Sequence, residues 1–274
     1  MNDYLQEPVA FWRFGYVAYI LVGVFTVWRP EMLRLYAASM MFTRNRGDRL
    51  GFSPAMTQRL LTITERRADL DYDVRLFRMH GAACMLAGVV GLTTGLNLAI
   101  IGSLLAVAVV FAFALAALSA KRKTSTRAAF VAGARRWAVA WWVVVVLLVM
   151  AAFEVAAGGF VSITVAAATI VCAAVIVLLG SQAAVLTGTD ITLESEVDHR
   201  FRTAQIVICA SFAMVPSQLW ILSVAWSSEY FTPHVFPFTN VMVVLVGTVA
   251  IWLYASTANG RSDRALRAAV RSAV

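Results

Sequence analysis

The segment GAACMLAGVVGLTTGLNLAIIGSLLAVAVVFAFALAALSA, residues 81–120, is apolar almost throughout and decides the class of fold. A helix rises about 1.5 Å per residue, so one straight helix over this segment would be about 60 Å long, roughly twice the hydrocarbon thickness of a membrane. The segment must therefore turn back on itself. TTGLN, residues 93–97, supplies the turn residues, and the sequence predicts a hairpin of two membrane-spanning helices.

The composition of the whole chain agrees with this prediction. Of the 274 residues, 61% are hydrophobic and 14% are charged, whereas soluble domains are about half apolar and about a quarter charged. We therefore expect an all-α, polytopic transmembrane bundle. In a soluble protein the net charge of +8 would suggest nucleic acid as a partner. Here the charge serves to orient the chain in the membrane, and no nucleic-acid partner is expected.

Seven apolar runs predict seven spans, and Gly158-Gly159 is expected to separate the fourth from the fifth. The predicted spans are residues 11–28, 81–94, 98–118, 137–156, 160–186, 203–226 and 236–254. Four regions follow from them: the outer N-terminus with the first span (1–28), an Arg-rich amphipathic segment (29–80), a six-span bundle of three hairpins (81–256) and a basic tail (257–274).

The distribution of charge predicts the orientation. All of the 23 Lys and Arg residues except Arg13 fall in segments on one side of the predicted spans. Positive charge is retained on the cytoplasmic side, so the N-terminus is expected outside and the C-terminus inside, in the cell inner membrane. Within the long basic segment, Ser53-Pro54 predicts the start of a helix, with serine as N-cap and proline at the first position.

The run DITLESEVDHRFR, residues 190–202, is the richest in potential ligands. Asp190, Glu194 and Asp198 are spaced by four residues and would share one helix face, where carboxylates could hold Mg²⁺ or Mn²⁺ and a lipid pyrophosphate. The alternative is a solvated face whose acids pair with the nearby arginines. We favour this alternative, and we expect neither a metal site nor a cofactor.

A second candidate lies within the sixth predicted span. Pro216 removes a backbone donor and predicts a kink, and Ser211, Ser217 and Gln218 are clustered around it. Polar groups at membrane depth are tolerated only inside protein or beside a wet cavity, so these four residues are the candidate substrate pathway. The alternative is a structural kink satisfied by its neighbours. Glu154 is expected near the outer end of its span, which leaves no ionisable group near the membrane midplane.

Two further patterns predict contacts. Gly81, Gly88 and Gly95 recur every seven residues and would let helices approach closely, within this chain or with a partner. Arg264, Arg267 and Arg271 lie around one side of a short predicted helix in the tail. Anionic lipid headgroups are the expected partner of these arginines.

Three functions remain open. The leading hypothesis is a non-catalytic integral membrane subunit or scaffold of a larger complex, because no nucleotide motif, redox site or midplane charge is found and the basic segments offer a docking surface. The alternative is a small-molecule transporter or channel-like protein with a pathway at Pro216. The third is a metal-dependent lipid-modifying enzyme at the cytoplasmic interface, which would use Asp190, Glu194 and Asp198.

Overall fold

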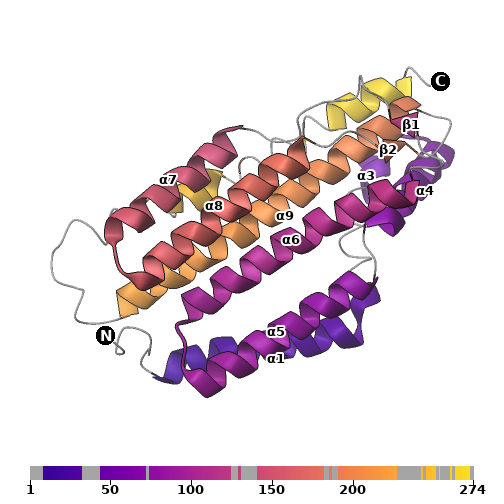
Figure 1. Cartoon of the computed structure of the whole chain (residues 1–274). Helices are drawn as coiled ribbons and strands as arrows, with labels where there is room; N and C mark the ends of the chain where they lie inside the picture. Colours follow the sequence, from indigo (N-terminus) through magenta and orange to yellow (C-terminus); the bar gives the residue numbers. More distant parts are fainter. Residues whose placement is uncertain are drawn as a thin grey trace.

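The computed structural model of the chain is an elongated and almost entirely helical bundle (Figure 1). The structure describes residues 9–32, 44–71, 74–124, 129–130, 141–181, 185–186, 191–226, 242, 245–250, 253, 260 and 263–271. Its labelled helices are α1 (Val9–Trp28), α3 (Arg44–Arg49), α4 (Pro54–Asp71), α5 (Val74–Thr94), α6 (Leu98–Thr124), α7 (Trp141–Ala157), α8 (Phe160–Gly180) and α9 (Ile191–Trp226). Two strands of two residues, β1 (Ala129–Phe130) and β2 (Val185–Leu186), pair antiparallel. Residues 263–271 form a further helix, here called the C-terminal helix.

Both predicted turns are confirmed. α5 ends at Thr94 and α6 begins at Leu98, and between them Gly95 has a φ of +65°, a conformation that favours glycine. Asn97 then caps α6, because its Oδ1 atom accepts a hydrogen bond of 2.8 Å from the backbone N–H of Ala99. Gly158 and Gly159, with φ of +70° and +88°, likewise separate α7 from α8.

The start of α4 is also confirmed at Pro54, where the Ser53 hydroxyl accepts a hydrogen bond of 3.3 Å from the Met56 backbone N–H. α9 differs from expectation, because the acidic run and the sixth predicted span form one continuous helix. This helix has 36 residues and is therefore about 54 Å long. This length is nearly twice the hydrocarbon thickness of a membrane, which is about 30 Å.

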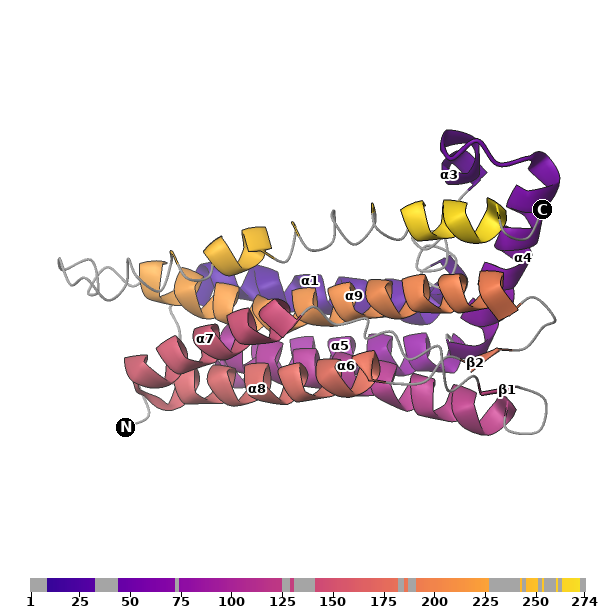
Figure 2. The same cartoon turned by 90° about the horizontal axis from the view of Figure 1, so that it is seen from above.

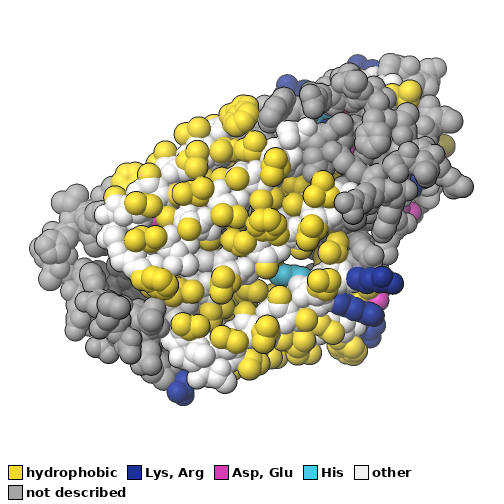
Figure 3. All heavy atoms as spheres, viewed as in Figure 1, with side chains coloured by type: hydrophobic (Ala, Val, Ile, Leu, Met, Phe, Trp, Pro, Cys, Tyr) yellow, Lys and Arg dark blue, Asp and Glu magenta, His cyan; other side chains and the backbone are white. Residues whose placement is uncertain are grey.

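Among the described residues, four helical segments are long and apolar enough to cross a membrane: Val74–Thr94, Leu98–Ala116, Phe160–Gly180 and Ile191–Ile221. Two apolar segments, Arg13–Trp28 and Trp141–Ala157, are shorter. The chain therefore has the helices of a multi-pass membrane protein. Hydrophobic side chains are spread over most of the described part of the face seen in Figure 3. Most of the seventh predicted span, residues 236–254, lies outside the described residues.

The bundle has two parts that lie side by side (Figures 1 and 2). α6, α7, α8 and α9 enclose the main core, which includes Val110, Leu147, Cys172 and Ile206. α1 and α5 pack closely on each other and contact the rest mainly through α6. The Tyr16 hydroxyl of α1 donates a hydrogen bond to the Leu96 carbonyl, which fastens α1 to the turn between α5 and α6.

One end of the bundle carries a separate cluster, here called the polar cap. It consists of α3, α4, residues 191–202 of α9 and the C-terminal helix, and it lies at the right of Figure 1. Leu60 of α4, Leu193 and Val197 of α9, and Leu266 and Ala269 of the C-terminal helix form its small apolar core. The cap therefore joins segments from both halves of the chain.

Candidate functional site

Two acidic side chains of α9 are buried in the polar cap. Glu194 is 7% exposed and Asp198 is 1% exposed. Asp198 accepts a hydrogen bond of 2.8 Å from Arg67 Nε of α4, and its other oxygen lies 2.9 Å from Arg202 Nε. Both arginines are themselves largely buried. The acids therefore pair with arginines, as favoured from the sequence, but the face they share is packed rather than solvated.

Glu194 also lies near an arginine. Its carboxylate lies 3.8 Å from Arg66, whose side chain is half exposed, so the pair is a weak one. Asp190 is outside the described residues. In the part of the chain that the structure describes, no group of three or more His, Cys, Asp or Glu residues could hold a metal ion.

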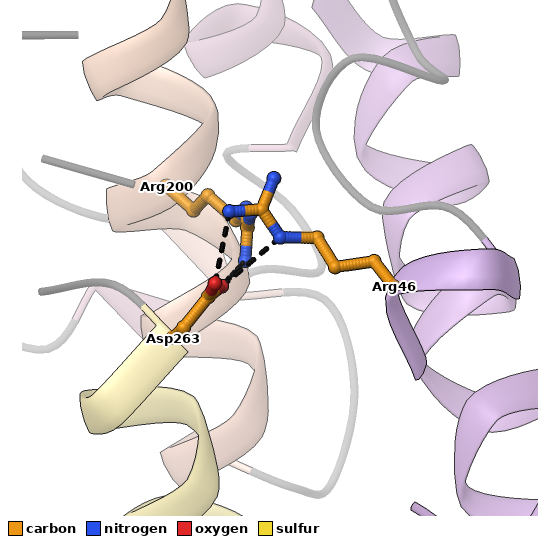
Figure 4. A network of polar contacts seen from close by, with 3 residues as sticks. All are labelled: Arg46, Arg200 and Asp263. Atoms are coloured by element: carbon orange, nitrogen blue, oxygen red, sulfur yellow. Dashed lines mark hydrogen bonds and ion pairs between the residues drawn. The ribbon is translucent and has the colours of Figure 1, made fainter. Parts of the chain in front are cut away.

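A second ion cluster closes the cap from the C-terminal side (Figure 4). The Asp263 carboxylate accepts two hydrogen bonds of 3.0 Å from Arg46 of α3 and one of 2.9 Å from Arg200 of α9. Arg200 is 5% exposed, and the two hydrogen bonds from Arg46 have the fork geometry that makes such pairs strong. One carboxylate thus connects three segments, two of them 217 residues apart in sequence.

The protonation of Asp263 follows from these contacts. Burial acts to raise the pKa of this carboxyl, but the hydrogen bonds and charges of Arg46 and Arg200 outweigh it and lower the pKa below the ordinary value of 3.8. A lowered pKa in the folded state means that the contribution to stability is complete above the ordinary value. This stabilising contribution of Asp263 is lost as the pH falls from about 4 through the lowered pKa.

Replacing Asp263 by asparagine is therefore expected to release the C-terminal helix at neutral pH. Loss of the charged hydrogen bonds of this partly exposed group costs about 1 to 2 kcal/mol, which raises the population of the open cap about 5- to 30-fold. Limited trypsin digestion, followed at Arg264 and Arg267, measures the opening. Asp48→Asn, a change at an exposed acid of α3, is the control and should leave the digestion rate unchanged. Equal rates in wild type and Asp263→Asn would contradict the prediction.

The polar residues around Pro216 point in different directions. Ser211 is exposed on the bundle surface and donates to the Val207 carbonyl at 2.8 Å. Gln218 Nε2 donates to Thr248 Oγ1 at 3.1 Å. Ser217 is fully buried, and its hydroxyl has no hydrogen-bond partner among the described residues. The structure therefore does not bring these side chains together around one pathway.

Ser217 is instead close enough to interact with Glu154 of α7, a residue for which the sequence predicts no role. The Glu154 side chain is 2% exposed, and within the described residues neither of its oxygens has a hydrogen-bond partner. Counting residues along α7 gives the depth of Glu154 in the span. It does not give the face that α8 and α9 cover.

The three glycines of the seven-residue pattern have two roles: two of them allow close helix packing, and the third lies in a turn. A Cβ atom on Gly81 would lie 2.8 Å from the Gly23 carbonyl oxygen, and one on Gly88 would lie 2.6 Å from the Tyr16 carbonyl oxygen. These two glycines therefore lie against the backbone of α1 within this chain. Gly95 follows the end of α5 in the turn to α6, and a Cβ there would meet no atom within 4 Å.

A cavity of about 330 Å³ lies between the α1–α5 pair and α6 and α9. Its lining is almost entirely apolar, with His80 and Tyr19 as polar exceptions. Phe212, Val215 and Leu219, on the turns of α9 that flank Pro216, form one wall. The cavity therefore lies beside the kink predicted from the sequence, on a different side from Ser217.

The last predicted contacts lie on the C-terminal helix. Arg264, Arg267 and Arg271 are all exposed, whereas Leu266 and Ala269 of the same helix face the core of the cap. The helix is thus amphipathic, with its basic side turned outward.

Comparison of the chain with protein-family models, curated proteins and solved structures found no match.

Proposed function

We propose that this chain is a non-catalytic integral membrane subunit or scaffold of a larger membrane complex. The arrangement of charged side chains in the polar cap is the main support for this proposal. Asp198 and Asp263 are used to hold the cap together, while Arg264, Arg267 and Arg271 face outward as a basic docking surface. A metal-dependent lipid-modifying enzyme has less support, because Glu194 and Asp198 are paired with arginines.

The proposal includes a topology. Seven spans place the N-terminus outside and the polar cap, with the C-terminus, in the cytoplasm at the cell inner membrane. The near-complete separation of Lys and Arg to one side of the spans supports this orientation. The exposed arginines of the C-terminal helix then lie close to anionic lipid headgroups, which attract basic segments beside a membrane. Other membrane subunits are the expected protein partners, and nucleic acid is not.

The test is purification from the native host in a mild detergent, followed by native sizing and mass spectrometry. We expect other membrane proteins to co-purify in a fixed ratio. Changing Arg264, Arg267 and Arg271 together to glutamate should reduce this recovery. Arg13→Glu, at the opposite end of the bundle, is the matched control and should not. A chain that purifies alone or only with copies of itself would contradict the scaffold function.

A second candidate function is transport of a small apolar molecule, favoured by the cavity beside Pro216. Its volume of about 330 Å³ lies within the range of small-molecule sites. An apolar lining with two polar side chains suits a largely hydrophobic ligand that carries one or two hydrogen-bonding groups. Phe212, Val215 and Leu219 would move with any change in the bend of α9, so the kink could alter the shape of the cavity.

Filling the cavity tests this second function. Ala18 lines the cavity from α1, so Ala18→Phe is expected to displace an apolar molecule that wild type retains through delipidation. Mass spectrometry of the organic extract measures the retained molecule. Ala82→Phe, at an exposed position of α5 that is not among the cavity-lining residues, is the control and should retain it. Equal retention by both variants would exclude the cavity as the binding site.

A further inference from the structure

The carboxyl group of Glu154 lies inside the helical bundle without a charge partner in the described structure. Its helix, α7, packs against α8 and α9. α8 contains no charged residue, and neither does α9 from Thr203 to Trp226. The described residues 245–250 also lack charge, although Gly247 lies close to Met150 of α7. None of these surrounding elements offers a cation to an ionised Glu154.

The lack of a cation in the described elements around Glu154 bears on its protonation state. An ionised carboxylate that is buried without a cation loses most of its hydration, and one hydroxyl donor such as Ser217 offsets only a small part of that cost. A protonated carboxyl carries no charge and avoids most of this cost. Its O–H group also needs only one acceptor, which a hydroxyl oxygen can supply.

The Ser217 hydroxyl is placed to be that acceptor. Ser217 is fully buried, its Oγ atom has no hydrogen-bond partner among the described residues, and it is close enough to the Glu154 carboxyl to interact with it. Because the next residue before it is Pro216, the backbone N–H that would bond to the Phe212 carbonyl is missing in this turn. The helix is therefore locally weaker where the two groups meet, and a small change in its bend alters their distance.

We propose that Glu154, with Ser217 as its partner, is a proton-binding site within the membrane-spanning bundle. The carboxyl takes its proton from water, holds it as an O–H group at neutral pH, and returns it to water when the site opens. No electron transfer or other reactant is involved. The site is independent of the scaffold function and would supply the buried acid that proton-coupled movement of a solute requires.

Infrared spectroscopy of the full chain in lipid nanodiscs tests the site. A protonated carboxyl has a carbonyl-stretching band that is separate from those of carboxylates and amides. We expect wild type at pH 7 to show such a band and Glu154→Gln to lose it. Glu194→Gln, which changes a buried glutamate that is paired with Arg66, is the matched control and should keep the band. Ser217→Ala should shift the band, because the hydrogen bond to the carboxyl is removed.

Thermal unfolding of the same variants gives a second, independent outcome. Glutamine resembles the protonated acid in shape and charge, so Glu154→Gln should unfold at the wild-type temperature or above it. A variant that does not fold, or that unfolds well below wild type, would show that the negative charge is needed and would overturn the proposal. An unchanged infrared spectrum in Glu154→Gln would overturn it as well.

Discussion

Replacing Asp198 by asparagine is expected to lower the free energy of unfolding by about 3 to 5 kcal/mol. Arg67 and Arg202 both direct a guanidinium nitrogen at this carboxylate, at 2.8 and 2.9 Å. Without it, two largely buried guanidinium groups lose the carboxylate that they share. Arg67 also lies over the ring of Phe201, but this contact is too weak to replace a carboxylate.

Thermal or denaturant unfolding in a mild detergent measures the effect. Glu65→Gln, at an exposed acid of the same helix as Arg67, is the control and should change stability by no more than about 0.5 kcal/mol. The physical reason can be tested by removing the charges together. The triple variant Arg67→Met, Asp198→Leu, Arg202→Met should be considerably more stable than Asp198→Asn. If Asp198→Asn unfolds like wild type, the buried ion cluster does not stabilise the cap.

The second large effect is expected at Gly88. Gly88→Leu should separate α1 from α5 and cost about 3 kcal/mol or more, because a side chain here has no space. Its Cβ atom would lie 2.6 Å from the Tyr16 carbonyl oxygen and 3.1 Å from the Ile20 backbone nitrogen. Backbone atoms cannot turn aside as a flexible side chain can, so the whole of α1 has to move.

Alkylation of cysteines locates this movement. Cys84 lies on α5 in the cluster between α1 and α6 and is buried, as are Cys172 and Cys209 in the main core. Gly88→Leu should make Cys84 reactive toward a maleimide while Cys172 and Cys209 stay protected. Ala82→Leu, at an exposed position of the same helix, should leave all three protected. Protection of Cys84 in both variants would show that α1 is not displaced.

The sequence predicts the parts of this fold that depend on local chemistry. Glycines at 95 and at 158–159 mark turns because their backbone conformations exclude most other residues. The apolar runs predict helices because each is too long and too hydrophobic for a surface loop. Ser53 marks a helix start because its hydroxyl accepts a hydrogen bond from a free backbone N–H of the first turn. Pro54 marks it because proline at the first helical position has no N–H that would need a partner.

The parts that depend on distant segments are not predictable in this way. The run of residues 190–202 resembles a solvated face because its arginine partner Arg67 is 131 residues away from Asp198 in sequence. In the sequence, Asp263 is a single acid within a basic tail. Its contacts with Arg46 and Arg200 exist only in the folded chain. Glu154 shows the same limit, because its burial is created by α8 and α9 and not by its neighbours in sequence.

The cluster around Asp263 also has a consequence for the synthesis of the protein. Arg46 is made 217 residues before Asp263, which corresponds to about 10 to 40 s of translation at ordinary rates. Until Asp263 is made, Arg46 lacks this carboxylate, and Leu60, Leu193 and Val197, once they are synthesised, lack the apolar cover of the C-terminal helix. Residues 263–271 therefore dock late, after most of the chain has been synthesised. Until that event, the exposed apolar core of the cap is a surface that chaperones and proteases can recognise.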